Sequence, residues 1–191
     1  LVRPDYSYSA KVGTEYNPFA HFHGAEEEDD IVLLQLQSPL LRKFDLANRR
    51  QHRAQLYTQF TPRDDVTFGL TGTYGLADYD ASPQGLQSDE RFSIGTDGSW
   101  QMNDRTRWAS YYTYEKIRAR QLSRFRTRAV AGGVTTVFDD PLNDWNSTTL
   151  DRVNTFGGSL NYAIRPGRWD STFTVTRQIA HGQTLASETP G

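Results

Sequence analysis

The sequence contains no cysteine in its 191 residues. The chain therefore has no disulfide bond, no thiolate metal site, no cysteine nucleophile and no CxxCH haem attachment of its own. Long apolar runs are missing as well, because the longest one, Ile31–Leu34, is far shorter than the ~20 residues of a transmembrane helix. The mean hydropathy of −0.69 agrees with this. These absences exclude a membrane-spanning helix in this sequence and any haem bound covalently to it.

An excess of charge of one sign is also missing. Lys and Arg together number 21 and Asp and Glu 23, so the formal net charge of −2 gives no indication of a nucleic-acid partner. The motifs GxSxG and HExxH and the phosphate-binding loop do not occur. We therefore expect a protein that is not an enzyme, binds no nucleic acid and binds no cofactor itself.

Aromatic residues are plentiful, at 13% of the chain, which argues against disorder. They recur in segments where apolar and polar residues alternate, most regularly in Val66–Leu76. A period of two is typical of a β-strand with one apolar face. About seven strands of roughly 10–13 residues are predicted, close to the length that crosses a bilayer at a tilt. They lie near Tyr6–Tyr16 and at Arg53–Phe60, Val66–Leu76, Arg91–Trp100, Thr106–Ile117, Val153–Ile164 and Trp169–Ala180.

The connections between these strands are alternately very short and long. Short turns at one end and long loops at the other are typical of a transmembrane β-barrel, with the turns in the periplasm and the loops outside the cell. The sequence thus predicts an all-β fold, an antiparallel up-and-down barrel in the outer membrane of a Gram-negative bacterium. The turns are Thr61–Asp65, Met102–Arg105 and Arg165–Arg168, and the predicted loops are Asn17–Asn48, Tyr79–Glu90 and Arg118–Thr149.

The whole chain, 1–191, is predicted to be a single barrel domain or part of one. Seven strands are few, no secretory signal precedes Leu1, and the last residues do not resemble a closing strand, which usually ends in an aromatic residue. We therefore expect a section of a larger barrel.

The two faces of the predicted strands differ in chemistry. One face is apolar and carries aromatic residues beside the short turns, where the inner girdle of a barrel lies, with Tyr74, Tyr79, Phe92 and Tyr114 expected in the outer girdle. The other face is too polar for a dry core and suits a wet lumen or the surface of an enclosed protein. A soluble β-domain with aromatics at the ends of its core is the alternative. Lipid-facing or girdle positions are predicted at Phe60, Phe68, Leu70, Tyr74, Trp100, Trp108, Tyr162, Trp169 and Phe173. Lumen-facing positions are predicted at Gln55, Tyr57, Gln59, Thr71, Thr73, Arg91, Asp97 and Arg107.

Two acidic segments are candidates for a divalent cation site. His21 and His23 precede the run Glu26–Asp30, so His21, His23, Glu26 and Glu27 offer imidazole and carboxylate ligands. A second segment holds Asp139, Asp140, Asn143 and Asp144. A solvated acidic loop outside the membrane is the alternative for both, and we expect no resident metal.

A basic run places six cations at even-numbered positions. If the strand extends above the membrane, they continue the outward face of Tyr112 and Tyr114 and face lipopolysaccharide phosphates or an acidic surface of an extracellular partner. Loop charge paired with nearby carboxylates is the alternative. The six are Lys116, Arg118, Arg120, Arg124, Arg126 and Arg128.

Several segments, in this order and spacing, resemble the MtrB/PioB family of outer-membrane proteins associated with decahaem cytochromes. They are LRKFDLANRR (Leu41–Arg50), YTQFTPRDDVTFGLTGTYGLADY (Tyr57–Tyr79), GLQSDERFSIGTDGSW (Gly85–Trp100), NDW (Asn143–Trp145) and DRVNTFGGSLNYAIRPGRWD (Asp151–Asp170).

The resemblance implies a barrel that encloses a periplasmic multihaem c-type cytochrome and insulates its haem wire. Electrons would pass between the periplasm and the outside, to or from an extracellular cytochrome or a mineral, and haem would be carried by the partner alone. Outer-membrane lipid and lipopolysaccharide would surround the barrel. The alternatives are a porin-like channel without a haem partner and a soluble β-rich binding module.

Overall fold

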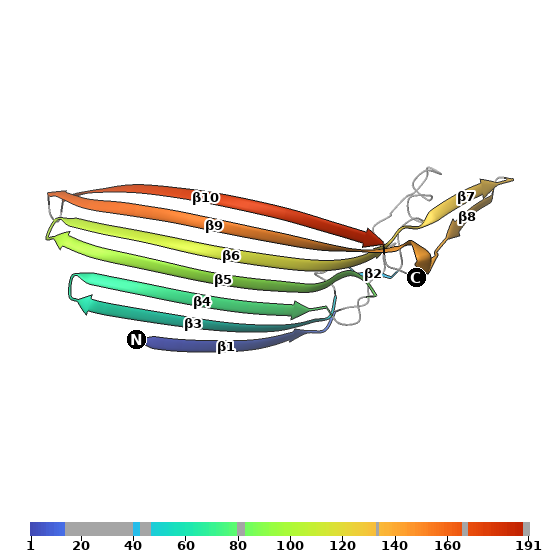
Figure 1. Ribbon diagram of the computed structural model, residues 1–191, viewed down its shortest axis with the longest axis horizontal. Coiled ribbons are helices and arrows are strands. Elements are labelled where there is room, and N and C mark those ends of the chain that lie inside the picture. The colour runs from blue at the N-terminus through green and yellow to red at the C-terminus, as the bar shows by residue number, and fades with distance from the viewer. Residues whose placement is uncertain (14–39, 43–46, 80–82, 133, 166–167, 189–191) are drawn as a thin grey trace.

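The computed structural model describes residues 1–13, 40–42, 47–79, 83–132, 134–165 and 168–188. Its main feature is one long antiparallel sheet, in which the strands lie side by side in the order β1-β3-β4-β5-β6-β9-β10 (Figure 1). The sheet is open, since β1 and β10 form its two edges. Its strands are β1 Val2–Lys11, β3 Arg49–Arg63, β4 Val66–Asp78, β5 Gln84–Asn103, β6 Thr106–Arg124, β9 Asp144–Arg165 and β10 Trp169–Glu188.

Smaller elements gather at the end of the sheet opposite the short turns. The two-residue strand β2, Leu41–Arg42, runs parallel to the start of β5. The hairpin of β7, Thr127–Ala131, and β8, Val134–Phe138, extends beyond the sheet (Figure 1). A 3-10 turn, η1 at Pro141–Asn143, leads into β9. In the described part of the chain there is no helix long and apolar enough to cross a membrane.

The predicted meander of antiparallel strands is confirmed, but the strands are longer than expected. The predicted loop Tyr79–Glu90 is wrong from residue 84 onward, because Gln84–Glu90 belong to β5. The predicted loop Arg118–Thr149 is wrong in the same way, since β6 runs to Arg124 and β9 starts at Asp144. Most of the third predicted loop, Asn17–Asn48, lies outside the described residues. Backbone pairing with the neighbouring strand continues these strands even where their side chains are polar on both faces.

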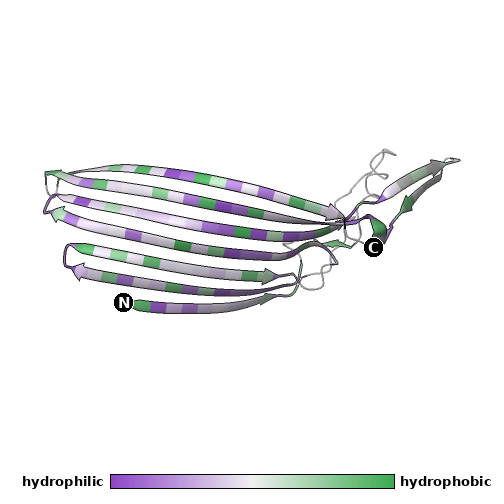
Figure 2. Cartoon of the chain, in the orientation of Figure 1, coloured by the Kyte–Doolittle hydropathy of each residue, from purple (hydrophilic) through white to green (hydrophobic). Residues whose placement is uncertain are grey.

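Apolar and polar residues alternate over much of the length of the long strands (Figure 2). What the sequence alone does not determine is whether neighbouring strands are in register, because a slip of one residue would bring unlike faces together. In the register observed, Phe60 pairs with Phe68, Val66 with Trp100 and Trp100 with Trp108. The apolar sides of the strands therefore form one continuous surface, the apolar face, and the polar sides form the polar face.

The sheet has almost no core of its own. Among the described residues, the buried apolar side chains are Ala47, Ala77 and Tyr79, a small cluster at the loop end of the sheet. Large side chains such as Phe60, Phe68 and Phe173 are instead more than half exposed. An exposed apolar surface of this size needs a covering medium or partner.

Candidate functional site

The eight side chains predicted to face a lumen all belong to the polar face. The cross-strand pairs Gln55–Thr73 and Tyr57–Thr71 join β3 to β4, and Asp97 lies opposite Gly69 on β4. Arg91 is an even number of residues from Asp97 on β5, so both lie on the same face, and Arg107 on β6 pairs with Gln101 of that face. The nine predicted apolar positions lie on the opposite face, so the structure separates the two sets.

Small side chains form rows across several strands of the polar face. One row, near the turns, consists of Thr67, Ser99, Ala109, Ser159 and Thr174, each paired directly with the next. A second row leads from Tyr57 at the β3 side to Gln178 on β10. Between them it passes through Thr71, Gly95, Thr113 and Thr155. The polar face is therefore low in relief over much of its width.

Two glycines allow larger polar-face side chains to lie flat against the sheet. A Cβ atom on Gly69 would come within 2.3 Å of the Asp97 carboxylate, and one on Gly157 would come within 2.1 Å of the Tyr111 ring. The Tyr111 hydroxyl reaches across β9 to the hydroxyl of Thr176 on β10, at 3.2 Å. Nothing in the sequence identifies Gly157 as the partner of Tyr111, because the two residues are brought together only by the register between β6 and β9.

A cavity of about 420 Å³ opens on the polar face toward the loop end. Its wall holds Arg49, Arg53 and Arg91 together with Asp89 and Glu115. Arg91 is paired with Asp89 at 2.9 Å. The Nε atom of Arg49 is buried and, in the described part of the chain, has no hydrogen-bond partner. Such a cavity suits an acidic group of a molecule lying against this face.

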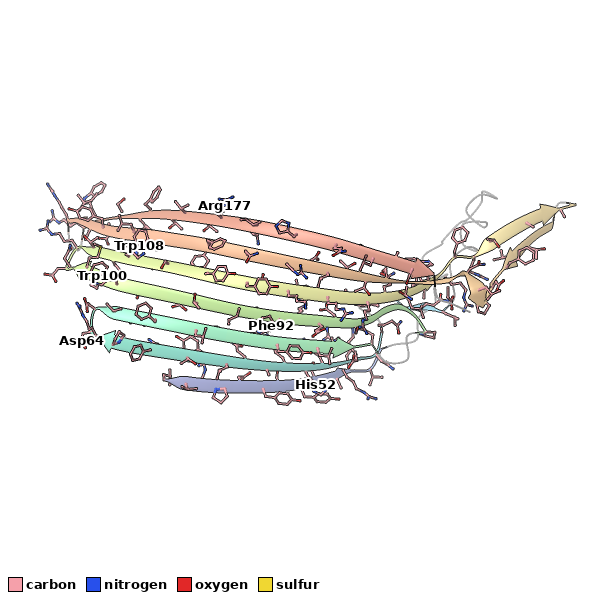
Figure 3. The ribbon with its side chains drawn as sticks, in the orientation of Figure 1. His52, Asp64, Phe92, Trp100, Trp108 and Arg177 are labelled. Atoms are coloured by element: carbon pink, nitrogen blue, oxygen red, sulfur yellow. The ribbon has the colours of Figure 1, made fainter. Side chains whose placement is uncertain are left out.

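The apolar face has its tryptophans next to the turns. Trp100 and Trp108 lie side by side on β5 and β6 near that end of the sheet (Figure 3), and Tyr162 is opposite Thr106. The indole N–H of Trp100 donates to the turn carboxylate of Asp65 at 3.2 Å. An aromatic ring with its apolar body on one side and a polar group at its tip suits the interface between hydrocarbon and water.

A second set of aromatics lies eight residues further along the strands. Tyr74 is opposite Phe92, and Phe92 packs edge-on against Tyr114 at 6.5 Å between ring centroids. Eight residues span about 27 Å along a strand and less across a tilted sheet, which is close to the ~25 Å apolar band of a transmembrane barrel. Tyr79, expected in this outer set, is buried at the loop end instead, because five residues from Tyr74 the alternation has reached the polar face.

Arg177 is the exception within the apolar band. It lies on β10 opposite Phe156, between the levels of the two aromatic sets. In the described part of the chain no ion pair involves it. On its other side no described strand pairs with it, because β10 is an edge of the open sheet.

Arg124 closes the base of the β7–β8 hairpin. It binds Asp144 through two nitrogens, at 2.5 and 3.1 Å, and Asp139 at 2.9 Å. The hydrogen bonds from Arg124 lower the pKa of Asp144 below its usual value. We call the contacts of Arg124 with Asp139 and Asp144 the Arg124 clasp. The sequence does not predict it, because the partners are 15 and 20 residues away from Arg124 along the chain.

The candidate cation site in the second acidic segment finds no support. In the second acidic segment Asp139 and Asp144 bind Arg124, and Asp140 accepts from the backbone N–H of Leu142 at 2.9 Å. No group of three or more His, Asp or Glu side chains able to hold a metal occurs among the described residues. The first segment, with His21, His23, Glu26 and Glu27, lies outside them.

Comparison with known proteins agrees with this geometry. A search of curated proteins finds no match. The family model described as "Putative outer membrane beta-barrel porin, MtrB/PioB" matches residues 2–172, which is most of the chain and all of the sheet except most of β10. The open sheet with one apolar and one polar face is then a section of the barrel wall, located in the outer membrane. The chain belongs to the MtrB/PioB family of outer-membrane β-barrel porins.

Proposed function

We propose that this barrel section encloses a periplasmic multihaem c-type cytochrome and positions it for electron transfer across the outer membrane. In this arrangement the polar face lines the lumen and contacts the cytochrome, while the apolar face meets lipid. The chain performs no redox chemistry and no catalysis, because the haem groups belong to the enclosed partner.

The observation that carries the proposal is the low relief of the polar face. Rows of Ser, Thr, Ala and Gly side chains let another protein surface approach the strands closely and hydrogen-bond to them. Tyr111 and Asp97, which would otherwise project from the face, lie over glycines. A packed partner requires this smoothness, whereas a water-filled pore does not.

The cavity lined by Arg49, Arg53 and Arg91 offers a fixed contact for the same partner. An acidic side chain of the cytochrome inserted there would satisfy the buried Nε of Arg49. This contact would set the depth of the cytochrome in the lumen. The β7–β8 hairpin, which extends beyond the sheet at the loop end, is the surface we assign to an extracellular cytochrome (Figure 1).

A porin-like channel without a haem partner is the second candidate. It is favoured by the charges that the polar face does carry, among them Asp97 and Arg107 in its middle and turn-side rows. Charged side chains lining a lumen tune ion passage in barrels. In that case the lumen would conduct ions through the native protein.

Co-purification separates the two candidates. The native outer-membrane protein, extracted in mild detergent, is expected to carry a c-type cytochrome seen by its haem absorbance and to show little ion conductance in planar bilayers until the cytochrome is removed. We call a barrel that encloses a cytochrome in this way a sheath. Repeated isolation without haem, together with stable conductance from the untreated protein, would overturn the sheath in favour of the channel.

A further inference from the structure

The apolar face ends in a cluster of cations at the level where the outer leaflet begins. Directly beyond the aromatic residues Tyr74, Phe92 and Tyr114, the same face of β6 carries Lys116, Arg118 and Arg120 at alternate positions. The neighbouring strand β9 adds Arg152, directly opposite Lys116. Lys116, Arg118, Arg120 and Arg152 form what we name the basic belt.

The basic belt is an unfavourable arrangement by itself. Like charges directly opposite in a ladder repel, and Lys116 and Arg152 form such a pair. The six cations of the sequence run do not behave alike, since Arg124 is clasped by two aspartates. No ion pair of the described residues includes a member of the belt. Glu90 lies opposite Arg118, but it accepts a hydrogen bond from the Tyr74 hydroxyl at 3.2 Å.

A cavity of about 320 Å³ joins the belt to the aromatic residues below it. Tyr74, Phe92 and Tyr114 supply apolar walls, and Lys116 and Arg118 line the same cavity. The carboxylate of Glu90 also lines it, so the two cations outnumber one anion there. A ligand suited to it has an apolar portion on the membrane side and an anionic group on the outer side. Lipids of the outer leaflet present their groups in this order, and guanidinium groups bind phosphate in a bidentate manner.

We propose that the basic belt binds the lipid A phosphates of lipopolysaccharide in the outer leaflet. The proposal depends on the apolar face meeting lipid, the orientation assigned under the proposed function, but it does not depend on a cytochrome in the lumen. The belt replaces the divalent cations that otherwise bridge neighbouring phosphates, and the phosphates relieve the repulsion between Lys116 and Arg152. The barrel thereby gains a fixed depth and a shell of bound lipopolysaccharide.

The experiment compares the native full-length protein with a variant carrying Lys116→Gln, Arg118→Gln, Arg120→Gln and Arg152→Gln. A control variant, Arg105→Gln with Arg165→Gln and Arg168→Gln, removes three cations from the turn end of the sheet, which faces the other leaflet. Each protein is reconstituted in phospholipid nanodiscs and titrated with lipopolysaccharide that has both lipid A phosphates, and separately with dephosphorylated lipopolysaccharide.

The belt variant is expected to bind phosphorylated lipopolysaccharide at least about tenfold more weakly, since each cation near an anionic lipid surface contributes about 1 kcal/mol. The control variant is expected to bind like the native protein, and the dephosphorylated form to bind all three equally weakly. Equal binding by the belt variant and the native protein would overturn the proposal. So would normal lipopolysaccharide binding with loss of an extracellular protein partner, which would assign the belt to that protein.

Two further measurements keep the result interpretable. If the fourfold variant does not fold, as judged by its heat-dependent mobility in gels, the single variants Lys116→Gln and Arg152→Gln are titrated, each with about a threefold to fivefold loss expected. Haem absorbance of the same samples reports the cytochrome independently. Loss of haem with intact lipopolysaccharide binding would concern the proposed cytochrome sheath and leave the basic belt unaffected. Loss of lipopolysaccharide binding with intact haem would concern the basic belt alone.

Discussion

The ring of Tyr111 on β6 lies over Gly157, its direct partner on β9, where a Cβ atom would come within 2.1 Å of the ring. An aromatic side chain thereby occupies the polar face without rising far above it. Because the glycine is required by the ring and the ring is held by Thr176, the three residues act as a unit.

Replacing Gly157 with alanine is expected to destabilise the barrel by about 1–3 kcal/mol, the usual cost of overpacking, since the ring must move and its hydrogen bond to Thr176 is lost. Gly158→Ala is the control, because a Cβ atom there would meet its nearest neighbours at 3.6 Å, an ordinary contact. Urea unfolding of the native protein in detergent measures both. In a double-mutant cycle, Tyr111→Ala should remove most of the cost of Gly157→Ala, and strict additivity would refute the coupling.

Arg177 provides a test of which face meets lipid. If the apolar face lies in the bilayer, Arg177→Leu is expected to stabilise the protein by about 2 kcal/mol, because arginine near the bilayer midplane is costly. Gln178→Leu, its neighbour on the polar face, should give no such gain. Unfolding midpoints in phospholipid bilayers provide the measurement. A gain from Gln178→Leu with none from Arg177→Leu would reverse the orientation of the sheet.

The clasp at the base of the β7–β8 hairpin should open in acid. Arg124 holds the pKa of Asp144 below its usual value, so the stability from this contact is fully present above the unfolded carboxyl's pKa of 3.8 and is lost as the pH falls through the lower folded value. Hydrogen exchange of residues 125–143 is therefore expected to quicken, after correction for intrinsic rates, below about pH 4. With Arg124→Gln the segment should exchange rapidly at all pH values, and an unchanged pH profile in that variant would show that the clasp is not the cause.

Because the side chains of the polar face are small, we expect larger side chains at these positions to weaken binding of the cytochrome. Thr71→Arg combined with Thr113→Arg places two long cations in one cross-face row and is expected to lower the haem that co-purifies severalfold, because a packed interface tolerates neither the volume nor the unpaired charge. Asp64→Arg, in the exposed turn between β3 and β4 (Figure 3), is the control for added charge. Full haem retention by the double variant would count against a protein packed on this face.

Much of this wall was predictable from sequence because the membrane imposes a regular pattern on it. Between Trp100 and Phe92 one face must be apolar and the other polar, so a period of two appears in the sequence, and the observed register keeps the like faces of neighbouring strands together. Beyond Phe92 that constraint ends. The strands continue through backbone pairing while both faces turn polar, so Gln84–Glu90 and Arg118–Arg124 were mistaken for loops.

Contacts between distant strands were not predictable in the same way. The Tyr111–Gly157 pair and the Arg124 clasp depend on the register between β6 and β9, which joins residues separated by 46 positions in the first case and 20 in the second. No periodicity within one strand encodes that register. The sequence likewise does not show which cations of the basic run form ion pairs. In the structure Arg124 pairs with Asp144, whereas Lys116, Arg118 and Arg120 belong to the basic belt.

Site-specific photo-cross-linking in intact cells tests the central claim most directly. A photoreactive residue is placed at Thr113 or Thr155 on the polar face, or at Tyr112 or Phe156 on the apolar face. The sheath predicts haem-staining adducts from positions 113 and 155 and none from positions 112 and 156. Haem adducts from the apolar face, or none from the polar face while the protein is correctly assembled in the outer membrane, would contradict it.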